Sequence, residues 1–135
     1  MGMGMMGGGG GECDVVYQDY NPIPKLSHLP EEFVFIDAGC ATKRDDPPFG
    51  SDPISRHLQH VLFPFPGYVS RLNSSTLEFV PLVRTGRLTG TVRTNDILEQ
   101  SFLGPGGLNE NRQRHPLNDS CVMAAKIRGK VPPAQ

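Results

Sequence analysis

The sequence predicts a mainly β fold in which an irregular N-terminal extension and a single helix precede a meander of short strands. Apolar residues recur at the spacing of a helix only between residues 52 and 63. From residue 68 onward, short runs of β-branched and aromatic residues follow one another instead. Turn residues separate these runs, among them Asn73-Ser74-Ser75, Gly86 and Gly104-Pro105-Gly106-Gly107, which is typical of all-β domains.

Residues 1–51 are expected to form a mostly irregular extension. The first ten residues are only methionine and glycine, and such a segment cannot offset its own ordering entropy. The prolines between residues 22 and 30 then favour extended backbone over helix. The short apolar run 32–37 is rich in strand-forming residues and could add one strand or a docking segment.

A helix is predicted over residues 52–63. The Asp52 side chain can accept hydrogen bonds from the unpaired N–H groups of a first turn. Pro53 suits the first helical position, where no N–H is needed. The apolar side chains that follow recur along one face: Ile54, Leu58, Val61 and Leu62. Phe63 and Pro64 end the element.

Strand-like runs follow at 68–72, 76–84, 87–93, 98–103 and 121–131, of which 98–103 fits a strand or one turn of helix. The short link through Gly86 between the second and third runs predicts a β-hairpin. Pro81 cannot donate to a strand ladder, so it marks an edge or a bulge. Gly90 predicts a bend of the kind that small barrels need at their corners. Residues 104–120 form a long polar loop.

The formal net charge of −1 conceals an uneven distribution. Residues 1–52 have a net charge of −6, and residues 53–135 have a net charge of +5. Eight of the ten basic side chains in the second part are arginines, which fork to phosphates and stack on bases. The distribution indicates contact with a nucleic acid or an acidic partner, or else a solvated basic face.

Little in the sequence supports catalysis, a metal centre or a membrane span. The three cysteines are widely spaced and form no zinc-like cluster, so we expect reduced thiols and no cofactor. His57 and His60 lie three residues apart, but no third ligand stands at a suitable spacing. No apolar run is long enough to cross a membrane, and residues 1–10 lack the features of a secretion signal. We therefore expect a soluble, intracellular protein that is not an enzyme.

Three segments resemble the Sm/LSm family. Asp52-Pro53-Ile54-Ser55 is similar to the proline-led entry helix of some members. Residues 86–103 resemble the first Sm motif, in which Gly90 is followed by Asp96 and then by Gln100, where the family has Asn. Lys126-Ile127-Arg128-Gly129 matches the Ile/Leu-Arg-Gly core of the second motif.

The resemblance implies that residues 52–135 form an Sm-like small barrel of five strongly bent antiparallel strands, with the loop 104–120 between the third and fourth. Members of this family join other Sm/LSm-type subunits in hetero-oligomeric rings that hold single-stranded, uridine-rich RNA. This chain would then act in pre-mRNA splicing or RNA processing, in the nucleus and/or the cytoplasm.

The resemblance also implies RNA contact by Asp96, Gln100, Arg128 and Gly129, on two loops that meet at one rim of the barrel. Arg128 can stack on a base or fork to a phosphate. Gly129 permits close approach of the backbone, and the Gln100 amide can read a base edge. Asp96 is expected to hold its loop rather than to touch RNA.

Two alternatives belong to other classes. The chain could be a structural subunit of a large macromolecular assembly that docks through extended segments without reading RNA. It could also be an accessory to an unrelated small-barrel enzyme. The runs 76–93 and 121–131 could supply the exposed strand edges through which neighbouring subunits join.

Overall fold

The computed structural model describes residues 14–41, 46–72, 76–101 and 104–130. These residues are mainly β, as predicted. Their strands are β1 (Asp14–Gln18), β2 (Phe33–Ile36), β3 (Val61–Pro64), β4 (Glu78–Arg84), β5 (Thr89–Arg93), β6 (Leu98–Ser101), β7 (Gly104–Leu108), β8 (His115–Pro116) and β9 (Val122–Arg128). Three short 3₁₀ helices, η1 (Pro24–Leu26), η2 (Ala38–Cys40) and η3 (Thr94–Asp96), connect them.

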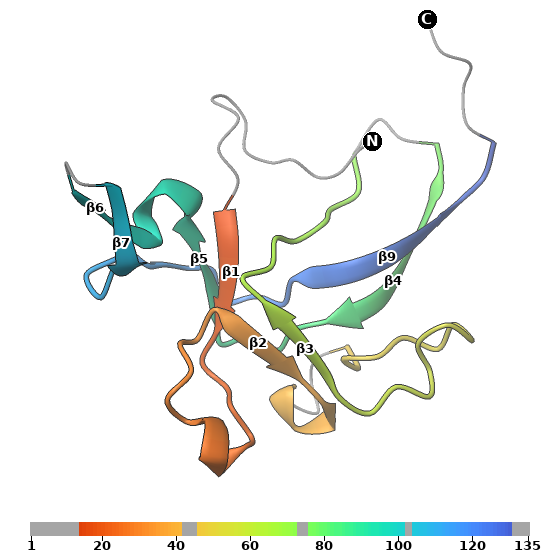
Figure 1. Ribbon diagram of the computed structural model, residues 1–135. Coiled ribbons are helices and arrows are strands. Elements are labelled where there is room, and N and C mark those ends of the chain that lie inside the picture. Colours follow the sequence, from red (N-terminus) through yellow and green to blue (C-terminus); the bar gives the residue numbers. More distant parts are fainter. Residues whose placement is uncertain (1–13, 42–45, 73–75, 102–103, 131–135) are drawn as a thin grey trace, which may run out of the picture.

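The strands form four small antiparallel sheets. Their orders are β1-β5-β8, β2-β3, β4-β9 and β6-β7. In Figure 1 the β6–β7 pair lies at the left edge of the molecule, β1 and β5 lie near the centre, and the β4–β9 pair extends to the right. Within the described residues these sheets form no closed barrel, and the Sm-like small barrel that the resemblance implied is not confirmed.

The N-terminal third is part of the folded body, in contrast to the irregular extension expected for residues 1–51. β1 pairs along its whole length with β5, from Asp14 opposite Arg93 to Gln18 opposite Thr89. β2 confirms the strand expected in the run 32–37 and pairs with β3. The expectation missed β1 because Val15, Val16, Tyr17 and Gln18 are all buried, so polar and apolar residues do not alternate there. Residues 1–13 lie outside the described part.

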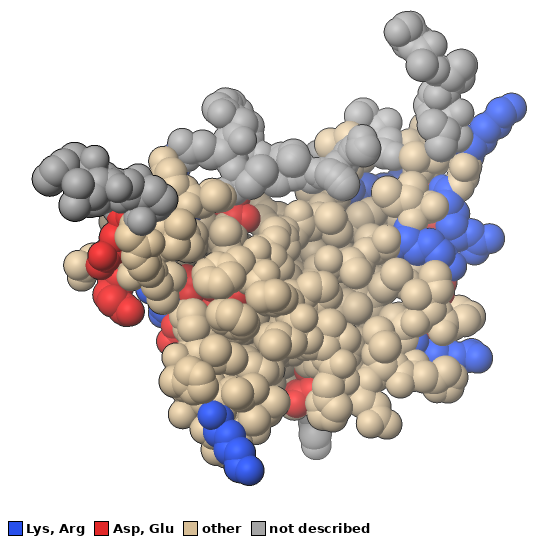
Figure 2. Space-filling model, viewed as in Figure 1, with Lys and Arg blue, Asp and Glu red and all other residues tan. Residues whose placement is uncertain are grey.

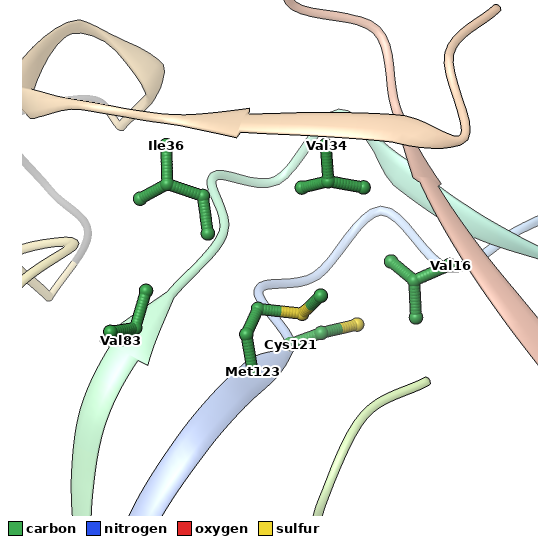
Figure 3. Close-up of a cluster of buried hydrophobic side chains, with 6 residues drawn as sticks. All are labelled: Val16, Val34, Ile36, Val83, Cys121 and Met123. Atoms are coloured by element: carbon green, nitrogen blue, oxygen red, sulfur yellow. The ribbon is translucent and has the colours of Figure 1, made fainter. Parts of the chain in front are cut away.

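The main hydrophobic core joins segments that are far apart in the sequence. Figure 3 shows Val16 of β1, Val34 and Ile36 of β2, and Val83 of β4 gathered around Cys121, which directly precedes β9, and Met123 of β9. A second cluster packs Tyr17 against Val92 and Ile97 on the other side of β1. Because β1 and β2 supply half of the first cluster, a boundary at residue 51 does not divide the packing.

The helix predicted over residues 52–63 does not form. The Asp52 side chain does accept a hydrogen bond from the Ile54 N–H (2.9 Å), but only turns follow as far as His57, and Val61–Pro64 becomes β3. The expected apolar stripe has nothing to pack against, since Ile54 is 61% exposed and Leu58 is 41% exposed. A segment this short is not stable as a helix without such packing, whereas the edge of β2 offers it a strand partner.

The hairpin predicted around Gly86 is also absent. β4 pairs with β9 and β5 pairs with β1, so the two strands that flank this link belong to different sheets. The link is buried and anchored: the Gly86 N–H donates to Gln18 Oε1 at 2.7 Å, and the Thr85 N–H donates to the Cys121 carbonyl at 2.9 Å. These long-range partners hold the link between two sheets and override its local turn chemistry.

The structure agrees more closely with the expectations for Pro81 and Gly90. A register shift beside Pro81 confirms the bulge expected there. Gly90 lies within β5, where a side chain would meet the Tyr17 ring and the His115 carbonyl oxygen (2.5 Å), so close packing requires this glycine. The loop expected at 104–120 contains β7, which pairs with β6, and the two-residue strand β8.

Candidate functional site

Asp96 holds a loop on the β6–β7 side of the molecule. It ends η3, and its carboxylate accepts hydrogen bonds from the Gln113 N–H (2.5 Å) and from Asn109 Nδ2 (3.2 Å). The carboxylate thus ties residues 109–113 to the start of β6, which is the loop-holding role expected of it. Gln100 lies in β6 with its backbone opposite Pro105, and its side chain lies outside the described part.

Arg128 and Gly129 lie at the far end of β9. Arg128 stands opposite Glu78 of β4, and its Nη1 atom is 3.8 Å from Glu78 Oε1. The Arg128 side chain is 65% exposed. Gly129 has a φ of +128°, a conformation that L side chains rarely adopt, so the backbone itself requires glycine where β9 ends.

The two loops expected to meet at one rim lie at opposite ends of the molecule. Figure 1 places β6 and β7 at the left edge and the C-terminal end of β9 at the right edge. The expectation depended on a barrel whose rim brings these two loops together. Instead, among the described strands β9 pairs with β4 alone, apart from one isolated bridge between Val122 and Val69, while η3 leads the chain from β5 into a separate hairpin. The chain therefore does not bring Asp96 and Arg128 together.

The strongest candidate site is the outer half of the β4–β9 ribbon, here called the ribbon tip and comprising Glu78–Pro81 and Ala125–Arg128. Residues directly opposite in an antiparallel pair share a face. Phe79 opposite Ile127 and Pro81 opposite Ala125 form an apolar face. Glu78 opposite Arg128 and Val80 opposite Lys126 form the other, charged face. Ile127 is 54% exposed, so the apolar face continues outward beyond the buried core.

One edge of the ribbon tip is open. β4 occupies one side of β9, and an isolated bridge joins Val122 to Val69 on its other side, near the core. Farther out, no strand among the described residues pairs with the second side of Ala125–Arg128. The backbone groups along such an edge are available to pair with an added strand.

The ribbon tip is also basic. Figure 2 shows Lys and Arg side chains gathered at the right-hand end of the molecule, over the end of the β4–β9 ribbon. Lys126 forms an ion pair with Asp52, which fixes the turn after residue 51 against β9. Hydrogen bonds from Lys126 and from the Ile54 N–H hold the pKa of Asp52 below its ordinary value. Because Arg128 is so exposed, its ion pair with Glu78 contributes little to stability.

A polar hollow of about 570 Å³ lies between the segment 27–31 and the segment 108–114. Its wall includes Arg112, which forms two hydrogen bonds to Glu32, from Nε at 2.7 Å and from Nη2 at 2.8 Å. Arg114 donates to Glu31 at 2.5 Å and lies 4.9 Å from the centre of the Tyr17 ring. Both guanidinium groups are thus engaged within the fold, and we interpret this wall as structural.

Sequence reasoning missed these ion pairs. Arg112 and Arg114 fall in the long polar loop expected at 104–120, and Glu31 and Glu32 fall in the acidic part of the chain, residues 1–52. The arginines lie about 80 positions from their carboxylate partners along the chain. The two adjacent glutamates immediately before an apolar strand could have indicated a buried ion pair. A carboxylate next to a buried strand is itself buried only when it has a basic or hydrogen-bonding partner.

The Glu31–Arg114 pair predicts acid sensitivity. Burial raises the pKa of Glu31, but a backbone hydrogen bond and Arg114 together outweigh burial, so this pKa lies below its ordinary value. The stabilisation is therefore complete above the ordinary carboxylate pKa and is lost as pH falls through the lowered one. We expect the melting temperature of Glu31→Gln to fall less steeply with acidification than that of the wild type. Thermal unfolding at a series of acidic pH values measures both slopes, and equal slopes would contradict this assignment.

Comparison with protein-family models, with curated proteins and with solved structures finds no significant match. The Sm/LSm resemblance accordingly rests on its three motif segments alone. Within the described ranges, no helix is long and apolar enough to cross a membrane. The same ranges contain no group of three or more His, Cys, Asp or Glu side chains placed to hold a metal ion.

Proposed function

We propose that this protein is a non-catalytic binding subunit of a larger assembly and that it docks by strand addition at the ribbon tip. The observation that carries the proposal is the open edge of Ala125–Arg128, on a ribbon that has one apolar and one charged face. Strand addition supplies main-chain hydrogen bonds, and the side chains on each face supply selectivity. The exposed Ile127 offers apolar contact area beside that edge.

RNA binding as an Sm/LSm-type ring subunit is the second candidate. One observation favours it: Lys126, Arg128 and Lys130 lie on or just beyond the end of β9, where they could contact phosphates. RNA contact by two converging loops is the weaker proposal, because the loop of Asp96 and Gln100 lies at the opposite end of the molecule from Arg128. Docking needs only the ribbon tip, so it is the proposal that the geometry favours.

Site-specific photo-cross-linking in cells separates the two candidates. A photoreactive phenylalanine analogue replaces Ile127, and the control carries the same analogue at Leu88, which is 63% exposed and lies outside the ribbon. Docking predicts a discrete adduct from position 127 that resists ribonuclease and is lost on proteolysis. Position 88 should give no such adduct. An adduct from 127 that ribonuclease removes would replace docking with RNA binding.

A further inference from the structure

We infer that the segment added at β9 comes from a different protein and is an extended strand in which apolar and acidic residues alternate. This inference rests on the proposed docking function and deepens it. It follows from three features of the ribbon tip: its two unlike faces, the sign of its charge, and the side from which Arg128 remains accessible.

The two faces set the alternation. A strand added beside β9 continues the ribbon, so its side chains point alternately to the two faces. On one face they would lie beside Ile127, which is 54% exposed, and an apolar residue there extends the Phe79–Ile127 surface. On the other face they would lie beside Lys126 and Arg128. Opposite charges are favourable between laterally neighbouring strands.

The charge of β9 argues against a second copy of the same edge. Residues 121–130 include three basic side chains, Lys126, Arg128 and Lys130, and no acidic one. Two β9 edges in antiparallel pairing would bring these like charges side by side, which is a recognised way in which edge strands avoid pairing with themselves. The same basic side chains attract the carboxylates of an acidic strand.

The existing ion pairs leave room for the added carboxylates. Glu78 reaches Arg128 from the β4 side at 3.8 Å, and both side chains are more than half exposed. Arg128 is 65% exposed, and no described strand pairs with this part of β9 on the side opposite Glu78. Lys126 is 28% exposed while it pairs with Asp52, and Lys130 follows the strand as an exposed residue. A partner carboxylate next to Arg128 therefore adds an interaction and does not need to displace Glu78.

Titration of the full chain with two capped peptides tests the inference. One peptide alternates glutamate with valine and the other alternates lysine with valine, each about six residues long. Backbone amide NMR shifts report which strand is contacted, and fluorescence anisotropy reports affinity. We expect the glutamate peptide to shift the amides of Ala125–Arg128 and to bind at least roughly tenfold more tightly than the lysine peptide. Arg128→Glu should weaken binding of the glutamate peptide by about tenfold. Lys25→Glu makes the same charge change on exposed η1 and should leave this affinity unchanged.

The outcomes separate the inference from the docking function. Equal shifts of the β9 amides by both peptides would overturn the acidic preference and leave strand addition standing. If neither peptide shifts those amides, both the inference and the docking function fail. Oligouridine added to a third sample tests RNA as the other class of partner. If oligouridine shifts the β9 amides and neither peptide does, RNA binding would replace both the inference and the docking function. A β9–β9 dimer of the free chain would overturn the choice of a different protein as partner.

Discussion

Replacing Arg112 by alanine is expected to destabilise the fold by about 3–5 kcal/mol, because the substitution leaves a buried carboxylate without its partner. Glu32 is fully buried and the Arg112 side chain is only 5% exposed, with two hydrogen bonds joining them. The pair ties the start of β2 to the segment that follows β7. Urea unfolding of the two proteins, followed by circular dichroism, measures the difference in the free energy of unfolding.

Two further variants identify the cause. The double variant Glu32→Leu with Arg112→Met removes both charges and should recover most of the lost stability, since apolar replacement of a buried pair is often neutral. Arg114→Ala removes a neighbouring, 34% exposed guanidinium and should cost clearly less than Arg112→Ala. A loss below about 1 kcal/mol for Arg112→Ala would show that Glu32 is not isolated from water as the structure has it.

Gly86→Ala is expected to cost roughly 3 kcal/mol or more, because its methyl group has no space. A Cβ atom at this position would overlap the carbonyl oxygen of Cys40 and lie 2.9 Å from its carbonyl carbon. These are backbone atoms, which cannot move aside as the end of a flexible side chain can. The same Gly86 N–H donates to the buried Gln18 amide, so a shift of the link would also strain that hydrogen bond.

Gly107→Ala is the matched control, because no heavy atom outside the glycine and its two chain neighbours lies within 4 Å of the position of the added Cβ. Thermal and urea unfolding of both variants should show a large loss for Gly86→Ala and a change within about 0.5 kcal/mol for Gly107→Ala. Similar stabilities of the two variants would mean that the Thr85–Gly86 link does not pass against Cys40.

Local patterns predicted the strands better than their partners. The runs containing β2, β4, β5 and β9 are visible in the sequence because β-branched residues stand between turn residues, whereas the run containing β6 fitted a strand or a helical turn equally well. The helix predicted at 52–63 was wrong because its apolar side chains have no surface to pack against, although Asp52 does accept the expected hydrogen bond from the Ile54 N–H. The hairpin at Gly86 was wrong because Gln18, 68 positions away, accepts the link's N–H. Both failures come from long-range packing, which local periodicity does not report.

Only the local features of the candidate site were predicted, because the sequence does not report long-range packing. The Ile-Arg-Gly segment at 127–129 does end a strand at the surface, and Gly129 does have a conformation that suits glycine. Its meeting with Asp96 depended on how the sheets close, which no local motif encodes. The open edge of β9 could be anticipated only as a general feature of a terminal strand, since its exposure depends on which strands pair with it.

Hydrogen–deuterium exchange of the free chain and of the same chain within its assembly tests the docking claim most directly. In the free chain, the amides of Ala125–Arg128 that face away from β4 should exchange rapidly, because they lie on an open edge. In the assembly these same amides should become protected, while β6 and β7 stay unchanged. Protection that appears on β6 and β7 and leaves Ala125–Arg128 as fast as before would contradict docking at the ribbon tip.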